Sequence, residues 1–364
     1  MKKQYDFWIL IISSMLVALG SIMVFSASPP SAYTYNGDAF YFIQKQIIMV
    51  GIGVVVMIAA MNFDYKRLGQ ISPILFFASI GLLVLVLVPG LGTASKGATR
   101  WLFNFQPSEV VKITLILFFS HFIAVKGEKV REFKAVLLPC IVYLGGIFFL
   151  LKMQPHMSAI GIIGIIAVIL LFCGGVRLDY LGVLGALGGA TVGVSMFSAE
   201  HSRIRITSFI SSIFNESEMG WQATNSLIAI GSGGLFGKGL TKSTEKFLYI
   251  PEPHNDFILS ILAEELGYIA VVFVIILFAL LIFRGYRVAI NVKDKQGSLM
   301  AIGITSMIAI QFILNVAVVS GIFPATGIPL PFFSYGGTSL ILLMGAVGIL
   351  LNISKSVNLE RIEQ

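Results

Sequence analysis

The chain has 364 residues, of which 57% are hydrophobic and only 12% are charged, and its formal net charge at pH 7 is +7. This composition provides too little polar surface to cover a soluble globule of that length, so it excludes an ordinary soluble enzyme and indicates a polytopic membrane protein. The basic residues are scattered between apolar segments rather than gathered in one patch, which argues against nucleic acid as a partner and for a role in membrane orientation.

The two cysteines, Cys140 and Cys173, both lie in apolar runs, which makes a disulfide framework or a cysteine-based metal site implausible. The apolar run over residues 7–26 follows a short basic start, but no small-residue cleavage site comes after it. We therefore expect this run to be a first transmembrane span rather than a signal peptide that is removed.

Ten apolar segments are long enough to cross the bilayer as helices, which takes about 20 residues for a hydrocarbon core of about 30 Å. We expect these spans at residues 7–27, 42–62, 72–90, 107–124, 135–151, 158–175, 180–197, 267–284, 299–320 and 337–353. The expected fold class is an all-α integral membrane protein, a bundle of about ten transmembrane helices. Residues 1–364 show no repeat and no separate soluble domain, so we expect a single domain with a large extracytoplasmic loop at residues 198–266, between spans seven and eight.

The connections between the spans alternate in charge. Lysines and arginines gather in every second connection, for example at Lys66 and Arg67 and over residues 126–134, while the opposite short connections carry few charges. Because basic residues prefer the cytoplasmic side, both termini are expected in the cytoplasm and the loop 198–266 outside. The pattern predicts a multi-pass membrane protein.

The connection between spans three and four contains Arg100, and Pro107, Ser108 and Glu109 then form a typical helix start. Glu109 and Lys112 are three residues apart, so they fall on one helical face and can form an ion pair. Ionisable groups within a bilayer are costly and are therefore candidates for function. A structural pair that only orients the helix is the alternative, and the sequence leaves both open.

The stretch 231–239 is rich in glycine around Lys238. It does not match a nucleotide-binding P-loop, because Ser232 stands where a glycine is needed and Gly239 stands where a hydroxyl residue should follow the lysine. A tight external turn and a nest of backbone amides for some other anion both remain open.

The polar stretch 249–267 holds most of the residues suited to chemistry. Pro251 and Pro253 prevent a regular helix within its first half, because proline lacks an amide donor and restricts the residue before it. Asp256 is then expected in the first turn of a helix that continues into the apolar run 268–283, where the helix dipole favours a carboxylate. The sequence is compatible with a functional carboxylate at the membrane boundary and also with a simple helix cap.

Two further outer segments carry polar groups. His156, in the turn between spans five and six, has no other ligands at a recognisable spacing, so hydrogen bonding is favoured over metal binding. The stretch 324–339 is dense in proline, glycine and hydroxyl residues, and such irregular backbone at membrane depth is tolerated only where protein or a water-filled cavity shields it. We expect it to line the same outward cavity as Asp256.

Together these blocks resemble the SEDS family of shape, elongation, division and sporulation proteins (RodA, FtsW and SpoVE) over essentially the full length of the chain. The sequence around Asp256 is more similar to FtsW and SpoVE than to RodA. The segments that carry the resemblance are Ala98-Thr-Arg100-Trp101-Leu102, Gln106-Pro-Ser-Glu109-Val-Val-Lys112, Gly220-Trp-Gln222-Ala-Thr-Asn-Ser226, the glycine-rich stretch, Lys246, Pro251-Glu-Pro-His-Asn-Asp256-Phe257, Glu264-Glu265-Leu-Gly267 and Ser334-Tyr-Gly-Gly337.

The resemblance implies a peptidoglycan glycosyltransferase that polymerises lipid II outside the membrane, by inverting transfer from a polyprenyl diphosphate donor, in division, elongation or sporulation. It also implies membrane lipid and a class B penicillin-binding protein, a transpeptidase, as partners. The family's essential aspartate falls on Asp256, which would accept the proton of a sugar hydroxyl or hold a divalent cation, magnesium or manganese, near the diphosphate. The residues expected to bind the substrate are Arg100, Glu109, Lys112, Arg203, Arg205, Gln222, Lys246, His254, Ser334, Tyr335 and Gly336.

The chain departs from the family in the turn between spans five and six, which commonly reads Gln-Pro-Asp. Here Gln154 and Pro155 precede His156, which leaves a catalytic or cation-binding role of this turn open. Two other functions compete with glycosyl transfer. A lipid II flippase is disfavoured because the polar groups gather on the outer face, without a charged pathway through the inner halves of the spans. A non-catalytic scaffold for the penicillin-binding protein would leave Asp256 dispensable.

Overall fold

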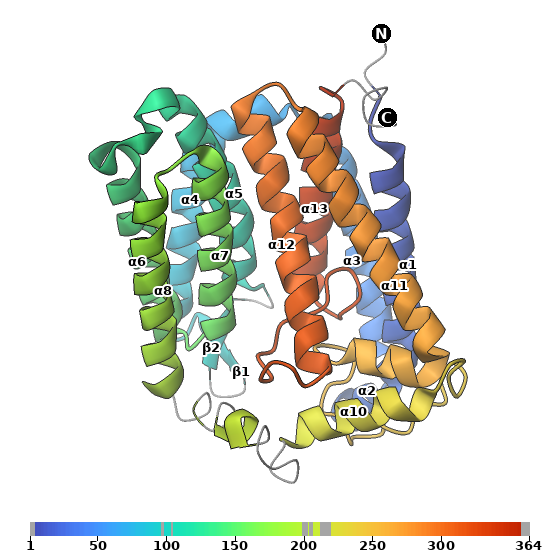
Figure 1. The fold of residues 1–364 in the computed structure, drawn as a ribbon. Coiled ribbons are helices and arrows are strands. Elements are labelled where there is room, and N and C mark those ends of the chain that lie inside the picture. The colour runs from blue at the N-terminus through green and yellow to red at the C-terminus, as the bar shows by residue number, and fades with distance from the viewer. Residues whose placement is uncertain are drawn as a thin grey trace.

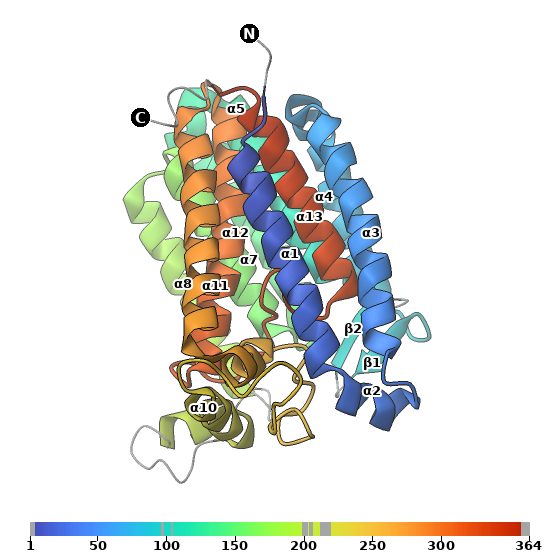
Figure 2. The same ribbon diagram turned by 90° about the vertical axis from the view of Figure 1, so that its right-hand side faces the viewer.

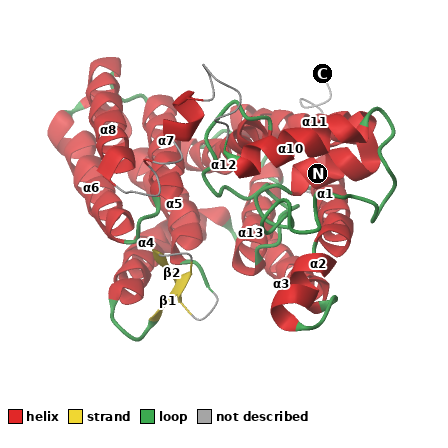
Figure 3. Cartoon of the chain, turned by 90° about the horizontal axis from the view of Figure 1, so that it is seen from below, coloured by secondary structure: helices red, strands yellow, loops and turns green. Residues whose placement is uncertain are grey.

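The computed structural model describes residues 4–95, 98–102, 105–198, 203, 207–211 and 220–357. Long helices run side by side as one bundle, and the short elements collect at one end of it (Figure 1). α12 lies near the middle, with α5 and α7 on one side and α11 and α13 on the other (Figures 1 and 3). α1 begins and α13 ends at the end opposite the short elements (Figure 2), where Asp6 N donates to Ser354 Oγ at 2.9 Å.

The long helices are α1 (Phe7–Ala27), α3 (Tyr41–Asn62), α4 (Tyr65–Leu87), α5 (Pro107–Lys126), α6 (Leu138–Met153), α7 (Met157–Gly174), α8 (Leu178–Ser198), α11 (Ile258–Asn291), α12 (Lys295–Val319) and α13 (Gly337–Ser354). Among the described residues, nine helical segments are long and apolar enough to cross a membrane. α8 is not one of the nine, but it packs beside α7 at the position of the predicted seventh span (Figure 1). The expected all-α membrane bundle is confirmed.

The predicted boundaries differ most from the structure at α4 and α11. α4 begins at Tyr65 rather than at residue 72, because the Asp64 side chain caps it by accepting from Lys66 N at 2.9 Å. α11 continues to Asn291, past the predicted end at residue 284. Both differences concern polar helix ends, which hydropathy alone does not detect.

The short elements lie at the end of the bundle that also holds Asp256. They are α2 (Pro29–Asn36), the antiparallel hairpin of β1 (Gly92–Ser95) and β2 (Ala98–Leu102), and α10 (Trp221–Gly233), which lies across the end of the bundle (Figures 1 and 2). At the opposite end, a 3-10 turn (Gly127–Arg131) and a π turn (Phe133–Leu137) lead into α6. The hairpin and α2 were not expected from the sequence.

α11 consists of two helical pieces joined at Gly267, whose backbone is not helical (φ 79°, ψ 179°). A Cβ on Gly267 would clash with the carbonyl oxygen of Leu235 and the amide of Gly237, so only glycine fits there. The piece before the break is buried, whereas Tyr268 and Ile269 directly after it are exposed on the outside of the bundle. The break coincides with the predicted start of the eighth span.

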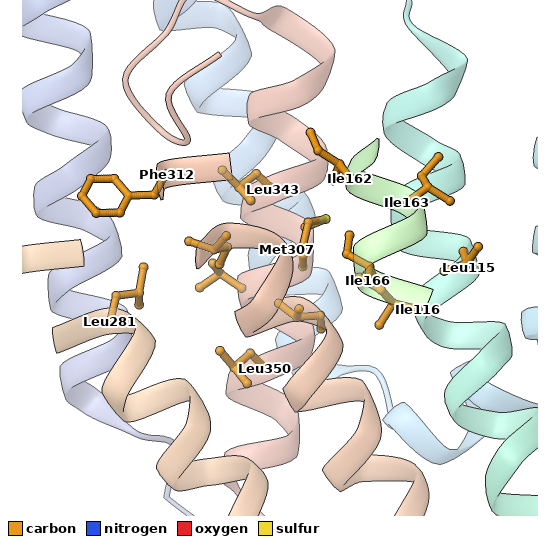
Figure 4. Packing of buried hydrophobic residues seen from close by; sticks show 14 of the residues in the cluster. Leu115, Ile116, Ile162, Ile163, Ile166, Leu281, Met307, Phe312, Leu343 and Leu350 are labelled. Atoms are coloured by element: carbon orange, nitrogen blue, oxygen red, sulfur yellow. The ribbon is translucent and has the colours of Figure 1, made fainter. Parts of the chain in front are cut away.

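Apolar side chains fill the interior between the long helices. Figure 4 shows part of this core, in which α7 contributes Ile162, Ile163 and Ile166 opposite Leu115 and Ile116 of α5. Ionisable side chains inside such an interior are stable only when they are paired or hydrogen bonded. The buried charged groups of this chain are therefore expected to have such partners.

Candidate active site

Asp256 lies in an irregular turn that follows Pro251 and Pro253. α11 begins only at Ile258, and its N-cap residue is Phe257. The expectation that Asp256 would lie in the first helical turn is therefore wrong, because the chain stays in turns through Phe257. The N-cap position is occupied by Phe257, whose side chain makes no capping hydrogen bond.

Two neighbours fix the position of the Asp256 turn. The buried side chain of Asn315, on α12, donates from Nδ2 to Asp256 O and to Ile328 O, both at 2.8 Å. One amide group thus joins the loop before α11 to the loop before α13, using both of its hydrogens. Gly327, at a φ of 70°, faces the aspartate: a Cβ there would lie 3.4 Å from Asp256 Oδ2. The carboxylate therefore faces the backbone of Gly327, which has no side chain.

The loop before α13 is also bonded to the segment just ahead of Asp256. Ser334 Oγ donates to Asn255 O at 2.6 Å, and Tyr335 N donates to His254 O at 2.9 Å. Three of the predicted site residues, His254, Ser334 and Tyr335, are thus brought together beside Asp256, and Gly336 follows directly as the N-cap residue of α13.

Aromatic rings cover this junction. The ring of Phe42, on α3, lies 4.3 Å from the His254 ring and 4.9 Å from the Tyr335 ring, measured between centroids. Phe332 and Phe333 are buried against the core. Protein thus shields the irregular backbone of this loop, as its composition predicted.

The predicted ion pair in the first turn of α5 is confirmed. Lys112 Nζ lies 2.7 Å from Glu109 Oε1, with the two side chains 3% and 12% exposed. Ser339 Oγ, in the first turn of α13, donates to Glu109 Oε2 at 3.1 Å. A small cavity, partly open to solvent, lies beside the pair; it is lined by Glu109, Ile113, Met307, Gln311, Ser339, Leu342 and Leu343.

Arg100, on β2, reaches the turn between α6 and α7. Its Nε donates to Gln154 O at 3.3 Å, and its Nη2 donates to Pro155 O. His156, next in this turn, is buried. Burial, together with the cations of Arg100 and Lys112, lowers the pKa of His156 to about 3. The imidazole is uncharged at neutral pH, so it adds no charge beside the two cations.

Residues 7–359 match the family described as Cell cycle protein, which comprises FtsW, RodA and SpoVE. The chain is 39% identical over 358 residues to stage V sporulation protein E of Bacillus subtilis, covering 97% of this chain and 98% of that protein. The chain belongs to the SEDS family. It is also 38% identical over 356 residues to the probable peptidoglycan glycosyltransferase FtsW of Geobacter sulfurreducens, with 97% and 95% covered.

Solved structures share the fold of this SEDS chain. The rod shape determining protein RodA of Thermus thermophilus superposes with a TM-score of 0.70 at 26% identity, with 96% of both chains covered. A chain from a peptidoglycan synthase complex that coordinates polymerization and crosslinking superposes with a TM-score of 0.77 at 24% identity, covering 96% of this chain and 97% of that one. Both similarities agree with the helical bundle expected from the sequence.

The glycine-rich stretch of this SEDS chain packs its backbone against the break in α11. Lys238 N donates to Glu264 O and Gly239 N donates to Glu265 O, both at 2.9 Å. Because these amides already bond to carbonyl groups, they do not form an anion nest. The tight-turn interpretation fits this part of the stretch.

Two buried glutamates anchor the same loop through their side chains. Glu264 Oε1 lies 2.6 Å from Lys238 Nζ, and Glu265 Oε1 lies 2.8 Å from Lys246 Nζ. Ser26, on α1, donates from Oγ to the second oxygen of Glu265. Lys246 was predicted to bind the substrate; its buried pair with Glu265 favours a structural role, and the substrate contact stays a prediction.

We expect Gly237→Ala to loosen this loop. At a φ of 77°, a Cβ would clash with the carbonyl of Glu265, so the variant should lose about 1–3 kcal/mol through overpacking, beyond about 1–2 kcal/mol of backbone strain. Gly37→Ala is the matched control, because Gly37 also has a positive φ (71°) but open space around its Cβ position. Thermal unfolding in detergent should give the Gly237→Ala protein a lower midpoint than the control variant. Equal midpoints would contradict the close packing of the glycine-rich stretch against the break in α11.

The remaining predicted site residues are Gln222, Arg203 and Arg205. Gln222 is half-buried on α10, and Arg203 is exposed. Arg205 lies outside the described residues. Substrate contacts from these three side chains stay predictions.

Sequence reasoning missed Asn315, the residue that holds the Asp256 turn in place. Its signal was an amide within the apolar predicted span 299–320, since polar groups inside spans are costly and mark special contacts. Gln311, one turn earlier on α12, carries the same signal and lines the cavity beside Glu109.

Proposed function

We propose that this chain is a peptidoglycan glycosyltransferase that polymerises lipid II at the outer face of a bacterial cytoplasmic membrane. The observation that carries the proposal is the Asp256 carboxylate, which lies against Gly327 in a turn fixed by Asn315 and joined to Ser334 and Tyr335. The name of the FtsW relative from Geobacter sulfurreducens supports the same activity.

Asp256 is suited to act as general base in this transfer. A sugar hydroxyl of the acceptor attacks the anomeric carbon of the donor, and the new glycosidic bond forms as the bond to the diphosphate oxygen breaks. The electron pair leaves with the diphosphate, and the hydroxyl proton passes to Asp256. Attack from the face opposite the leaving group inverts the anomeric centre. A diphosphate is already a stable anion, so no second carboxylic acid is needed to protonate it.

Glu264 is not a second catalytic carboxylate in this scheme. It is fully buried, and Lys238, Ser243 and the amide of Thr244 already bind its oxygens. A glycoside hydrolase would need two opposed carboxyl groups, about 5–9.5 Å apart across the scissile bond. The arrangement therefore favours transfer from an activated donor.

A divalent cation is the other way in which Asp256 could act. Among the described residues, no three histidine, cysteine, aspartate or glutamate side chains gather into a metal site. Magnesium, however, is commonly held by one or two carboxylates together with substrate phosphates. Asp256 fits such a site, with the diphosphate and water as the remaining ligands.

The substrate diphosphate needs cationic contacts, for which we propose Arg100 and Lys112, near the first turn of α5. Arg203, Arg205 and Lys246 are the further candidates named from the sequence. We also propose a class B penicillin-binding protein as transpeptidase partner.

The assay that tests this function offers lipid II to the purified protein in detergent, with and without the partner and a divalent cation. Glycan strands made there support the polymerase, because a detergent solution has no second compartment into which a flippase could move lipid. A flippase or a scaffold would leave lipid II unchanged under all conditions, provided that no other glycosyltransferase is present.

We further propose that both termini are cytoplasmic and that the Asp256 turn faces outward. Single cysteines at the exposed positions Lys242 and Lys129, in a background lacking Cys140 and Cys173, should label differently in intact cells. An impermeant maleimide should reach only the cysteine at position 242. Labelling at position 129 alone would reverse the proposed orientation.

A further inference from the structure

The turn between α6 and α7 holds a buried group that the proposed chemistry does not use. His156 is 7% exposed and is the N-cap residue of α7, but its side chain makes no capping hydrogen bond. Its backbone amide donates to Leu151 O at 3.0 Å, so the backbone is held in place. The imidazole is thus fixed at the start of an 18-residue helix, whose dipole favours negative charge there.

One ring nitrogen has a neighbour and the other does not. Gln106 Nε2 lies 3.5 Å from His156 Nε2, and an amide nitrogen can only donate, so this contact favours the neutral ring that carries its proton on Nδ1. Within the described residues, His156 Nδ1 is buried and has no hydrogen-bond partner. A buried donor without a partner costs free energy, and a ligand acceptor would remove that cost.

The charges around the ring are suited to an anion. Arg100 and Lys112 act electrostatically on His156 and help to keep it neutral. The turn itself supplies no carboxylate: Gln154 and Pro155 precede His156. Glu109, the nearest carboxylate to Lys112, is engaged by that lysine and by Ser339.

We propose that His156 Nδ1–H and the Arg100 guanidinium form a binding site for a phosphate oxygen of an isoprenyl diphosphate, the leaving group of the donor. This inference rests on the proposed function and adds a contact specific to this chain. Arg100 is anchored to the carbonyls of Gln154 and Pro155, which holds its cation at the same turn.

The test compares His156→Asn with His156→Leu, two variants of similar size. The asparagine amide can place a donor where Nδ1–H now lies, whereas leucine has no donor. We expect farnesyl diphosphate to bind the Asn variant within about threefold of the unmodified protein, and the Leu variant about tenfold or more weakly, as for loss of a hydrogen bond to a charged group. Farnesol binding should be the same in all three proteins.

Further ligands identify the source of the phosphate. Inorganic diphosphate and phosphatidylglycerol should compete weakly; strong competition by either would assign the site to free phosphate or to a membrane headgroup and overturn the proposal. Equal binding of farnesyl diphosphate by the Asn and Leu variants would also overturn it, as would an unmodified protein that binds farnesol as tightly as farnesyl diphosphate.

The binding measurement needs no turnover, so it is independent of glycan synthesis. A protein that prefers farnesyl diphosphate to farnesol but makes no glycan would contradict only the proposed polymerase function. Glycan synthesis by the unmodified protein, together with unimpaired farnesyl diphosphate binding by the His156→Leu variant, would overturn only the His156 site. If a His156 variant does not fold, the same binding assay can compare Arg100→Gln with Arg100→Lys. The lysine variant keeps the positive charge and should bind farnesyl diphosphate more tightly than the glutamine variant.

Discussion

Asp256→Asn should reduce glycan synthesis by about 100-fold or more, the range associated with loss of a general base. The change keeps the size of the side chain and much of its hydrogen bonding, but it removes the charge and the basicity. The backbone contacts that fix the turn, from Asn315 to Asp256 O and from Ser334 to Asn255 O, do not involve the carboxylate. Lipid II binding, membrane insertion and partner association should therefore persist.

Stability controls distinguish this loss of activity from unfolding. If Asp256 acted only as a helix cap, Asp256→Ala would cost about 0.5–2 kcal/mol of stability and Asp256→Asn less, because asparagine caps nearly as well. Ser334→Ala is the matched control beside the aspartate: it removes the donor to Asn255 O without changing any carboxylate. A folded Ser334→Ala protein should retain more activity than a folded Asp256→Asn protein.

Lys112→Met should destabilise the protein by about 3–5 kcal/mol, because it leaves the buried carboxylate of Glu109 without its cation. Combining Lys112→Met with Glu109→Gln should restore much of this stability, since no uncompensated charge then remains. Thermal unfolding in detergent would show the midpoint of the double variant above that of the single variant. A double variant no more stable than the single one would contradict the paired arrangement.

The activity of the same two variants tests whether the pair is only structural. If Lys112 also contacts the diphosphate, as we propose, both the single and the double variant should lose glycan synthesis even where the double variant is well folded. Recovery of activity in step with stability would confine Glu109 and Lys112 to a structural role.

Much of the fold could be predicted because membrane spans follow hydropathy. α1 begins and ends at the predicted residues, whereas α11 begins at Ile258 and only its internal break at Gly267 coincides with the predicted start of the eighth span. The start of α4 was missed because Lys66, Arg67 and Gln70 lower the hydropathy of its first turns, although Asp64 caps the helix ahead of them. The hairpin was missed because four or five residues per strand leave little signal.

The site was predictable where a local pattern decides the contact. The Glu109–Lys112 pair follows from helical spacing alone, and the sequence blocks around residues 254 and 334 belong together in space as expected. Contacts between distant segments were not accessible in this way. The pairing of Lys246 with Glu265, and the double hydrogen bond of Asn315 to residues 256 and 328, depend on how the loops fold back onto the bundle.

The central claim is that this chain itself polymerises lipid II and does so through Asp256. The most direct test measures glycan strands formed from labelled lipid II by the purified protein and, side by side, by folded Asp256→Asn protein, each with the same partner and cation. Our account predicts muramidase-sensitive strands from the unmodified protein and about 100-fold less product from the variant. Near-normal synthesis by the folded variant, or no synthesis by the unmodified protein under any of these conditions, would contradict it.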